Sequence, residues 1–129
     1  MRTKTIHQSA VIKASPHQIY EMLMDSKKHS QMIGDEAKIS REIGGRIEAW
    51  GDYVDGVNLE LVPDQKIVQK WRASDWPEGH YSMATFELVE IEDATKLLFT
   101  QTGVPEDFFE DISKGWWDYY WNPMKEMLE

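Results

Sequence analysis

Residues 105–128, PEDFFEDISKGWWDYYWNPMKEML, form the longest segment of the sequence with helical periodicity. At 100° per residue, most of its apolar side chains fall within an arc of about 120°. These are Phe108, Phe109, Ile112, Trp116, Tyr119, Tyr120 and Met127. A helix of this length spans about 36 Å. It is the only segment of the chain long enough to cover one face of a large sheet, and we expect Trp116 and Ile112 to be core contacts.

A second apolar patch lies beside the first and widens the apolar surface of this helix to about 220°. It consists of Trp117, Trp121, Met124 and Leu128. Because a surface helix ordinarily needs a stripe of about 100°, two interpretations follow. Either Trp117 and Trp121 are peripheral and pack under loops, or part of the surplus lines a cavity or contacts a partner. Gly115 and Pro123 interrupt the helix, and a kink at Pro123 favours a pocket beneath it.

The rest of the chain alternates between apolar and polar residues, as strands do. Residues 3–14 are predicted to form the first strand. Ser15 is then predicted to cap a helix that ends near Asp25, with Pro16 in its first position and Gln18 completing a capping box. A second short helix covers about 26–33 and stops at Gly34. Further strands are predicted near 37–43, 46–53, 56–62, 65–73, 80–91 and 95–103, with turns at 44–45, 55–56, 63–64, 76–79 and 92–94.

Such short connections require antiparallel pairing, because a parallel crossover needs a dozen or more residues. The predicted fold class is therefore α+β. A curved antiparallel sheet of about seven strands carries two short helices and the long C-terminal helix. No linker or internal repeat divides the sequence, so residues 1–129 are predicted to form a single domain.

Composition restricts the classes of partner. The 129 residues carry 14 basic and 23 acidic side chains, a formal net charge of −9. This charge disfavours nucleic acid and anionic membranes as partners, because both would repel the protein. No segment approaches the roughly 20 apolar residues of a membrane span, and the N-terminal segment does not resemble a signal peptide. We therefore expect a cytoplasmic location. The absence of cysteine excludes disulfides and thiol catalysis.

The sequence contains no recognisable catalytic or metal-binding motif. His7, His17, His29 and His80 lie far apart, without the spacing of metal ligands, and are expected to be solvated on the surface. Neither a nucleophile elbow nor a phosphate-binding glycine loop is present. We therefore predict no catalytic residue, no metal site and no cofactor.

The candidate site is instead an apolar cavity between the C-terminal helix and the sheet. Gln8, Gln69 and Gln101 share the strand face of apolar neighbours. Their amides either orient a ligand or are satisfied near strand ends by backbone or water. Aromatic residues on facing elements give such a pocket large contact areas. The predicted ligand-binding residues are Trp50, Tyr53, Gln69, Trp71, Phe86, Phe99, Gln101, Trp116 and Tyr120.

Several short motifs are similar to those of a known family. They are Trp50-Gly51-Asp52-Tyr53 with Gly56, Leu61-Val62-Pro63, Lys70-Trp71-Arg72, Gly103-Val104-Pro105, Gly115-Trp116, Tyr120 and Pro123-Met124. In these the sequence resembles the Hsp90-ATPase-activator homologues of the START-like (Bet v 1-like) superfamily over nearly its whole length. The resemblance implies a helix-grip fold with an apolar cavity. In the wider superfamily such domains bind sterols, lipids, polyketides and plant hormones.

Three functions are compatible with the sequence. The first is a non-enzymatic domain that binds a small hydrophobic or aromatic molecule in the cavity. The alternative is a module that docks on an Hsp90-type chaperone, which a continuous exposed patch at Trp117 and Trp121 would favour. The third is an enzyme acting inside the cavity. That function needs a carboxylate or histidine pointing inward, and none has suitable strand parity.

Overall fold

The computed structural model describes residues 1–129 and contains one seven-stranded antiparallel sheet in the order β1-β7-β6-β5-β4-β3-β2. The strands are β1 (Thr3–Ile12), β2 (Ala37–Ile39), β3 (Arg46–Ala49), β4 (Val54–Val62), β5 (Lys66–Ala73), β6 (Ser82–Ile91) and β7 (Ala94–Pro105). The curved sheet with its long C-terminal helix confirms the predicted helix-grip fold.

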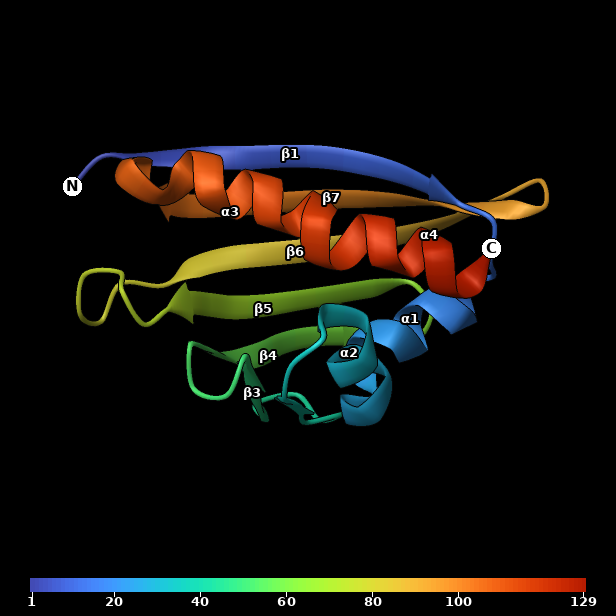
Figure 1. The fold of residues 1–129 in the computed structure, drawn as a ribbon, viewed down its shortest axis with the longest axis horizontal. Coiled ribbons are helices and arrows are strands. Elements are labelled where there is room, and N and C mark those ends of the chain that lie inside the picture. The colour runs from blue at the N-terminus through green and yellow to red at the C-terminus, as the bar shows by residue number, and fades with distance from the viewer.

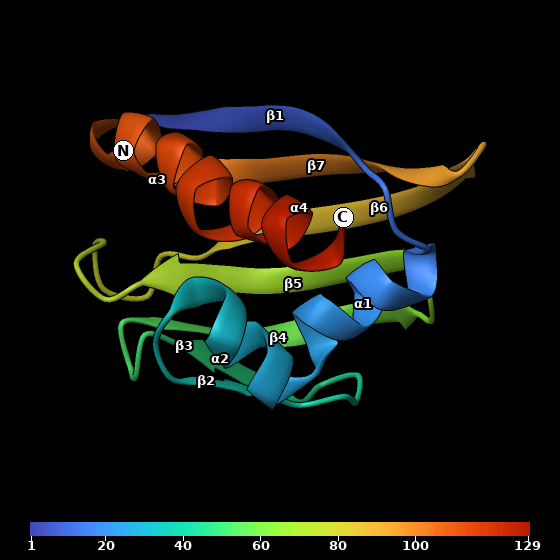
Figure 2. The ribbon, with the colours of Figure 1, turned by 45° about the vertical axis from the view of Figure 1, so that its right-hand side comes forward.

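All helices lie on one face of the sheet (Figures 1 and 2). The two short ones, α1 (Pro16–Met24) and α2 (Ser26–Ile33), cover the β4–β5 side. The C-terminal helix crosses the β6–β7 side as four consecutive segments. These are η1 (Glu106–Phe108), α3 (Phe109–Trp116), η2 (Trp117–Trp121) and α4 (Asn122–Leu128). No helix in the chain is long and apolar enough to cross a membrane.

The start of α1 follows from local chemistry. Ser15 accepts a hydrogen bond from the Gln18 amide, and the Gln18 side chain accepts one from the Ser15 amide, which completes the predicted capping box. Pro16 occupies the first helical turn, where its missing N–H costs nothing. Gly34 ends α2 in the left-handed conformation.

The turn predicted at Asp55–Gly56 is wrong. The chain reverses at residues 50–53, where Trp50 (φ 53°) and Gly51 (φ 66°) are left-handed, and β4 starts directly afterwards. Gly56 lies within β4, and a Cβ there would be 1.9 Å from the carbonyl oxygen of Lys70. The glycine therefore permits close strand approach and does not form a turn. The strands predicted at 37–43 and 46–53 are shorter than expected and end at Ile39 and Ala49.

The phase of the C-terminal helix changes within η2, which is a π-helical turn in which the Asn122 amide donates to the Trp117 carbonyl. Such a turn holds one more residue than an α-helical turn, so every later side chain is displaced by about 100°. The core face then continues as Tyr120, Trp121, Met124 and Leu128, in place of the predicted Tyr119, Tyr120 and Met127. Trp121 and Met124 are fully buried, whereas Tyr119 and Met127 are nearly half exposed.

The peripheral position expected for Trp121 is therefore wrong, while Trp117 is half-buried. Ile112 is also only half-buried, although Trp116 is in the core as predicted. Trp116 and Trp121 stack with their ring centroids 5.7 Å apart and their planes 17° apart. Phe99 of β7 packs on both, at centroid distances of 4.4 and 5.4 Å.

Two glutamines accept hydrogen bonds from the indole N–H groups of these tryptophans. Trp116 Nε1 donates to Gln101 Oε1 at 2.8 Å, and Trp121 Nε1 donates to Gln8 Oε1 at 2.7 Å. Gln101 Nε2 donates in turn to the Ser82 hydroxyl, and Gln8 Nε2 donates to the Ser113 carbonyl. The amide oxygens of Gln8 and Gln101 accept hydrogen bonds from buried indoles and are therefore not free for a ligand. Neither amide relies on backbone or water alone at a strand end.

His29 is buried, contrary to the predicted surface position. Its Nδ1 lies 2.9 Å from the Leu23 carbonyl oxygen, and its Nε2 lies 2.8 Å from the Tyr120 hydroxyl oxygen. A carbonyl only accepts, so Nδ1 carries the proton and Tyr120 donates to Nε2. Burial lowers the pKa of His29 and raises that of Tyr120, so both groups remain neutral.

We expect Trp121→Ala and Trp116→Ala each to destabilise the protein by about 3–5 kcal/mol, because each truncates a buried aromatic ring. Trp117→Ala is the matched control on the same turn and should cost clearly less, since its side chain is only half-buried. Denaturant titrations with constant m-value measure the differences. A loss below about 1 kcal/mol for Trp121→Ala contradicts the burial assigned to it.

We expect stability to fall as pH decreases below about 6.5. His29 has a folded-state pKa below its ordinary value of 6.5, so between these two values the unfolded chain binds the extra proton. The slope approaches about 1.4 kcal/mol per pH unit for one proton. His29→Gln keeps a hydrogen-bonding side chain without a titrating group, and denaturant melts from pH 7.5 to 5 should show a flatter profile for it. Parallel profiles for the two proteins contradict the assignment.

Candidate functional site

An open cleft of about 350 Å³ lies between the C-terminal helix and the β3–β4 end of the sheet. Helix segments α3 and η2 form one wall, while the 50–53 turn, the start of β4 and the C-terminal end of β5 form the other. Eight of its ten lining residues are hydrophobic. The lining consists of Trp50, Tyr53, Val54, Trp71, Asp111, Ile112, Gly115, Trp116, Tyr119 and Tyr120.

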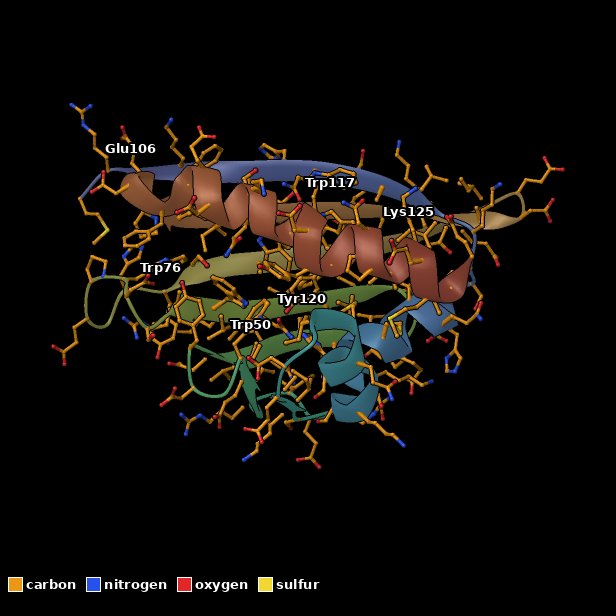
Figure 3. All side chains as sticks on the ribbon, viewed as in Figure 1. Trp50, Trp76, Glu106, Trp117, Tyr120 and Lys125 are labelled. Carbon is orange, nitrogen blue, oxygen red and sulfur yellow. The ribbon has the colours of Figure 1, made fainter.

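The aromatic walls meet at steep angles. The Trp50 ring lies 5.6 Å from that of Tyr119 and 6.2 Å from that of Tyr120, at interplanar angles of 80° and 70°. Figure 3 shows Trp50 and Tyr120 on the β5 side of the helix, whereas Trp117 lies on the β1 side. The left-handed backbone of Trp50 is unfavourable for a bulky residue, typically by about 1–3 kcal/mol. Strain of this kind and π-helical turns are both frequent at functional sites.

Negative charge surrounds the mouth of the cleft. Asp111 is part of the lining, and the Tyr53 hydroxyl donates to the Asp75 carboxylate at 3.2 Å. The pKa of Tyr53 is raised first by burial and then by Asp75 and Asp111. Neither carboxylate lies within 4.0 Å of a lysine or arginine nitrogen, and no basic residue lines the cleft.

The structure brings five of the nine predicted site residues into this cleft: Trp50, Tyr53, Trp71, Trp116 and Tyr120. Gln69 and Phe86 border a separate internal void of about 10 Å³. Phe99 and Gln101 belong to neither space and are core residues. Gln69 Nε2 donates to Asn58 Oδ1, so a protein group occupies its donor.

The space predicted between helix and sheet takes the form of the open cleft beside the helix, and the interior beneath the helix holds no comparable cavity. The void there is no larger than the roughly 10–15 Å³ that a single water molecule requires. The rings of Phe86, Phe99, Trp116 and Trp121 pack against one another in this interior; Trp116 and Trp121 are stacked, and the other pairs are tilted or edge-to-face. The usable space lies beside the helix, open to solvent.

Five lining residues were not predicted as cleft residues: Val54, Asp111, Ile112, Gly115 and Tyr119. Asp111 is an exposed acidic residue of the helix, and Tyr119 belongs to the arc predicted to face the core. The π turn displaces Tyr119 outward from the core. Gly115 was noted only as an interruption, yet a Cβ there would meet just one neighbouring atom, Tyr119 Cδ2 at 3.9 Å. Its side of the helix therefore faces open space.

Chemically, the cleft offers aromatic surface with carboxylates at its edge. No group of three or more histidine and acidic side chains is placed to hold a metal ion. The His29–Tyr120 pair adjoins the cleft through Tyr120, but both groups are buried and their polar atoms are bonded to each other. The site is suited to binding an apolar or cationic group.

Comparison with known proteins gives related sequences that are Hsp90 activators by name. The activator of 90 kDa heat shock protein ATPase homolog of Dictyostelium discoideum is 32% identical over 115 residues, which is 88% of this chain and 30% of that protein. The human activator homolog 1 is 29% identical over 87% of this chain and 33% of its own length. The chain thus spans about a third of these relatives.

Solved structures share the fold. An HSP90 activator from Plasmodium falciparum superposes with a TM-score of 0.90 at 22% identity, covering 95% of this chain and 94% of that one. The Aha1 dimer from Colwellia psychrerythraea gives 0.83 at 24% identity, covering 98% and 96%.

The sequence model of one family, described as Activator of Hsp90 ATPase homolog 1-like protein, matches residues 13–129. This range includes every element of the fold except β1. The chain belongs to the family of Activator of Hsp90 ATPase homolog 1-like proteins.

Proposed function

We propose that this domain binds an Hsp90-type chaperone and stimulates its ATPase. The observation that carries the proposal is family membership across residues 13–129. The relatives named as activators match this chain over about a third of their length. We therefore propose chaperone contact for the domain that this chain shares with those relatives.

Two features of the surface support docking on a protein. The interior is filled, whereas the 350 Å³ cleft is open and lined by six aromatic residues, of which Tyr53 and Tyr119 expose 37% and 48% of their surface. Tyrosine is among the residues that contribute most to protein interfaces. The adjacent start of the C-terminal helix carries Glu106, Asp107, Glu110 and Asp111. This acidic border favours a partner with a basic surface.

We expect the chain to raise the ATPase rate of a purified Hsp90-type chaperone from the same host in a saturable manner. Tyr119→Ala should weaken this effect at least about fivefold, which corresponds to the 1 kcal/mol that marks an important interface residue. Met83→Ala is the control, because Met83 is equally exposed but lies on the opposite face of the sheet. An unchanged ATPase rate together with no binding by calorimetry contradicts the proposal.

A second candidate function is binding of a small apolar or aromatic molecule in the cleft. The specific observation in its favour is the volume of about 350 Å³ with a hydrophobic lining, since ligand pockets commonly measure about 300–1,000 Å³. Three tryptophans, Trp50, Trp71 and Trp116, belong to the lining and report on occupancy by fluorescence.

We expect Gly115→Leu to block the cleft without unfolding the protein. A side chain at this position enters open space beside Tyr119, and replacing a helical glycine removes its entropic penalty. Titration with the neutral fluorophore N-phenyl-1-naphthylamine should show at least about tenfold weaker binding, a change of 1.4 kcal/mol. Glu110→Leu adds the same side chain on the same helix outside the cleft and serves as the control. Equal binding by both variants contradicts occupancy of the cleft.

A further inference from the structure

We propose that the cleft is a binding site for a small organic cation that carries a methylated ammonium group on an apolar body. This inference deepens the second function proposed above by naming its ligand class, and it does not depend on chaperone binding. It rests on the aromatic walls of the cleft, on the charge around its mouth and on its hydrophobic lining.

The walls are the first argument. Six aromatic side chains line the cleft: Trp50, Tyr53, Trp71, Trp116, Tyr119 and Tyr120. A cation is attracted to a ring face within about 6 Å of its centroid, most strongly by tryptophan. The centroids of Tyr119 and Tyr120 lie 5.6 and 6.2 Å from that of Trp50, on planes nearly perpendicular to it. One cation near this corner is therefore within reach of several rings.

Charge is the second argument. The Asp111 carboxylate lines the cleft, and Asp75 is held at its edge by the Tyr53 hydroxyl. The nearest lysine on the same helix, Lys114, is paired with Asp118 at 2.6 Å. The carboxylates at the mouth thus have no basic partner, and the chain has a net charge of −9. This field attracts a cation and repels an anionic ligand such as a fatty acid.

The hydrophobic lining selects the type of cation. A primary ammonium carries three N–H donors that must be satisfied when water is removed. Asp111 is the single charged acceptor among the lining residues. A quaternary ammonium has no donor and presents methyl groups, so it loses less hydration in an aromatic cleft. Aromatic recesses of this composition are the usual receptors for quaternary ammonium ligands.

The test compares choline with 3,3-dimethylbutan-1-ol, its neutral carbon isostere, by calorimetry and by amide chemical shifts. We expect choline to bind at least about fivefold more tightly, which is the effect of one favourable cation–π contact. Shifts should cluster on the cleft residues. Equal affinity for the two compounds, or binding of neither at millimolar concentration, overturns the proposal.

Matched variants separate the two contributions. Trp50→Leu keeps apolar bulk but removes a ring, so it should weaken choline at least about fivefold and leave the isostere unchanged. Asp111→Asn should weaken choline by a few-fold, and more at low salt than at high salt. The control is Asp93→Asn, which makes the same charge change in the distant β6–β7 turn, where asparagine tolerates the left-handed backbone.

An equal loss of choline affinity in Asp93→Asn and Asp111→Asn shows that choline is attracted by the overall charge, and this result overturns the proposed site. If the chain activates the chaperone while choline does not bind, the ligand class fails and the chaperone function stands. If choline binds as expected and the ATPase rate of the chaperone does not change, the ligand class stands and the chaperone function fails.

Discussion

Two buried indole N–H groups constrain the whole assembly. Trp116 and Trp121 lie inside the sheet's concave face, where an unpaired donor would cost about 1–3 kcal/mol. Gln101 on β7 and Gln8 on β1 supply the acceptors. Because each amide accepts in one direction from a fixed strand position, the helix is fixed in both rotation and translation. Apolar packing alone, which is non-directional, would not fix this register.

The π turn is the backbone's response to that constraint. Trp116 and Trp121 are five residues apart, which in a regular α-helix would place them about 140° apart around the axis. The extra residue in η2 brings them to the same face, where their rings stack 17° from parallel. The same displacement places Tyr119 and Tyr120 in different environments. Tyr120 enters the core beside His29, and Tyr119 is displaced to the cleft.

Much of the fold could be predicted because its signals are local. Strand alternation, the capping box at Ser15 and Gly34 after α2 each depend on neighbouring residues, and the structure confirms them. The helix phase could not be predicted beyond Trp117. A period of 3.6 residues assumes regular α-helical hydrogen bonding. The π turn departs from it and brings the two indoles to acceptors on strands that are distant in sequence. Pro123 indicated an irregularity without indicating its kind.

The candidate site was predictable to the extent that it reuses core residues. Trp71, Trp116 and Tyr120 face both the interior and the cleft, so inward parity identified them. Asp111 carries no such signal, because the sequence does not distinguish an acidic residue beside a cleft from one on the open solvent face of a helix. His29 was missed for a related reason. Its neighbours in the chain are polar, and the hydroxyl that it binds lies on Tyr120, 91 residues away.

The shared residues also explain why a cleft open to solvent has fixed walls. Trp116 is held by Gln101 and Tyr120 by His29, so two of its rings cannot rotate without breaking buried hydrogen bonds. Trp50 is positioned by a left-handed turn that joins two paired strands. Ordering such side chains on binding would otherwise cost about 0.5–1.5 kcal/mol each. The core interactions that hold the helix to the sheet therefore also preorganise the aromatic wall of the site.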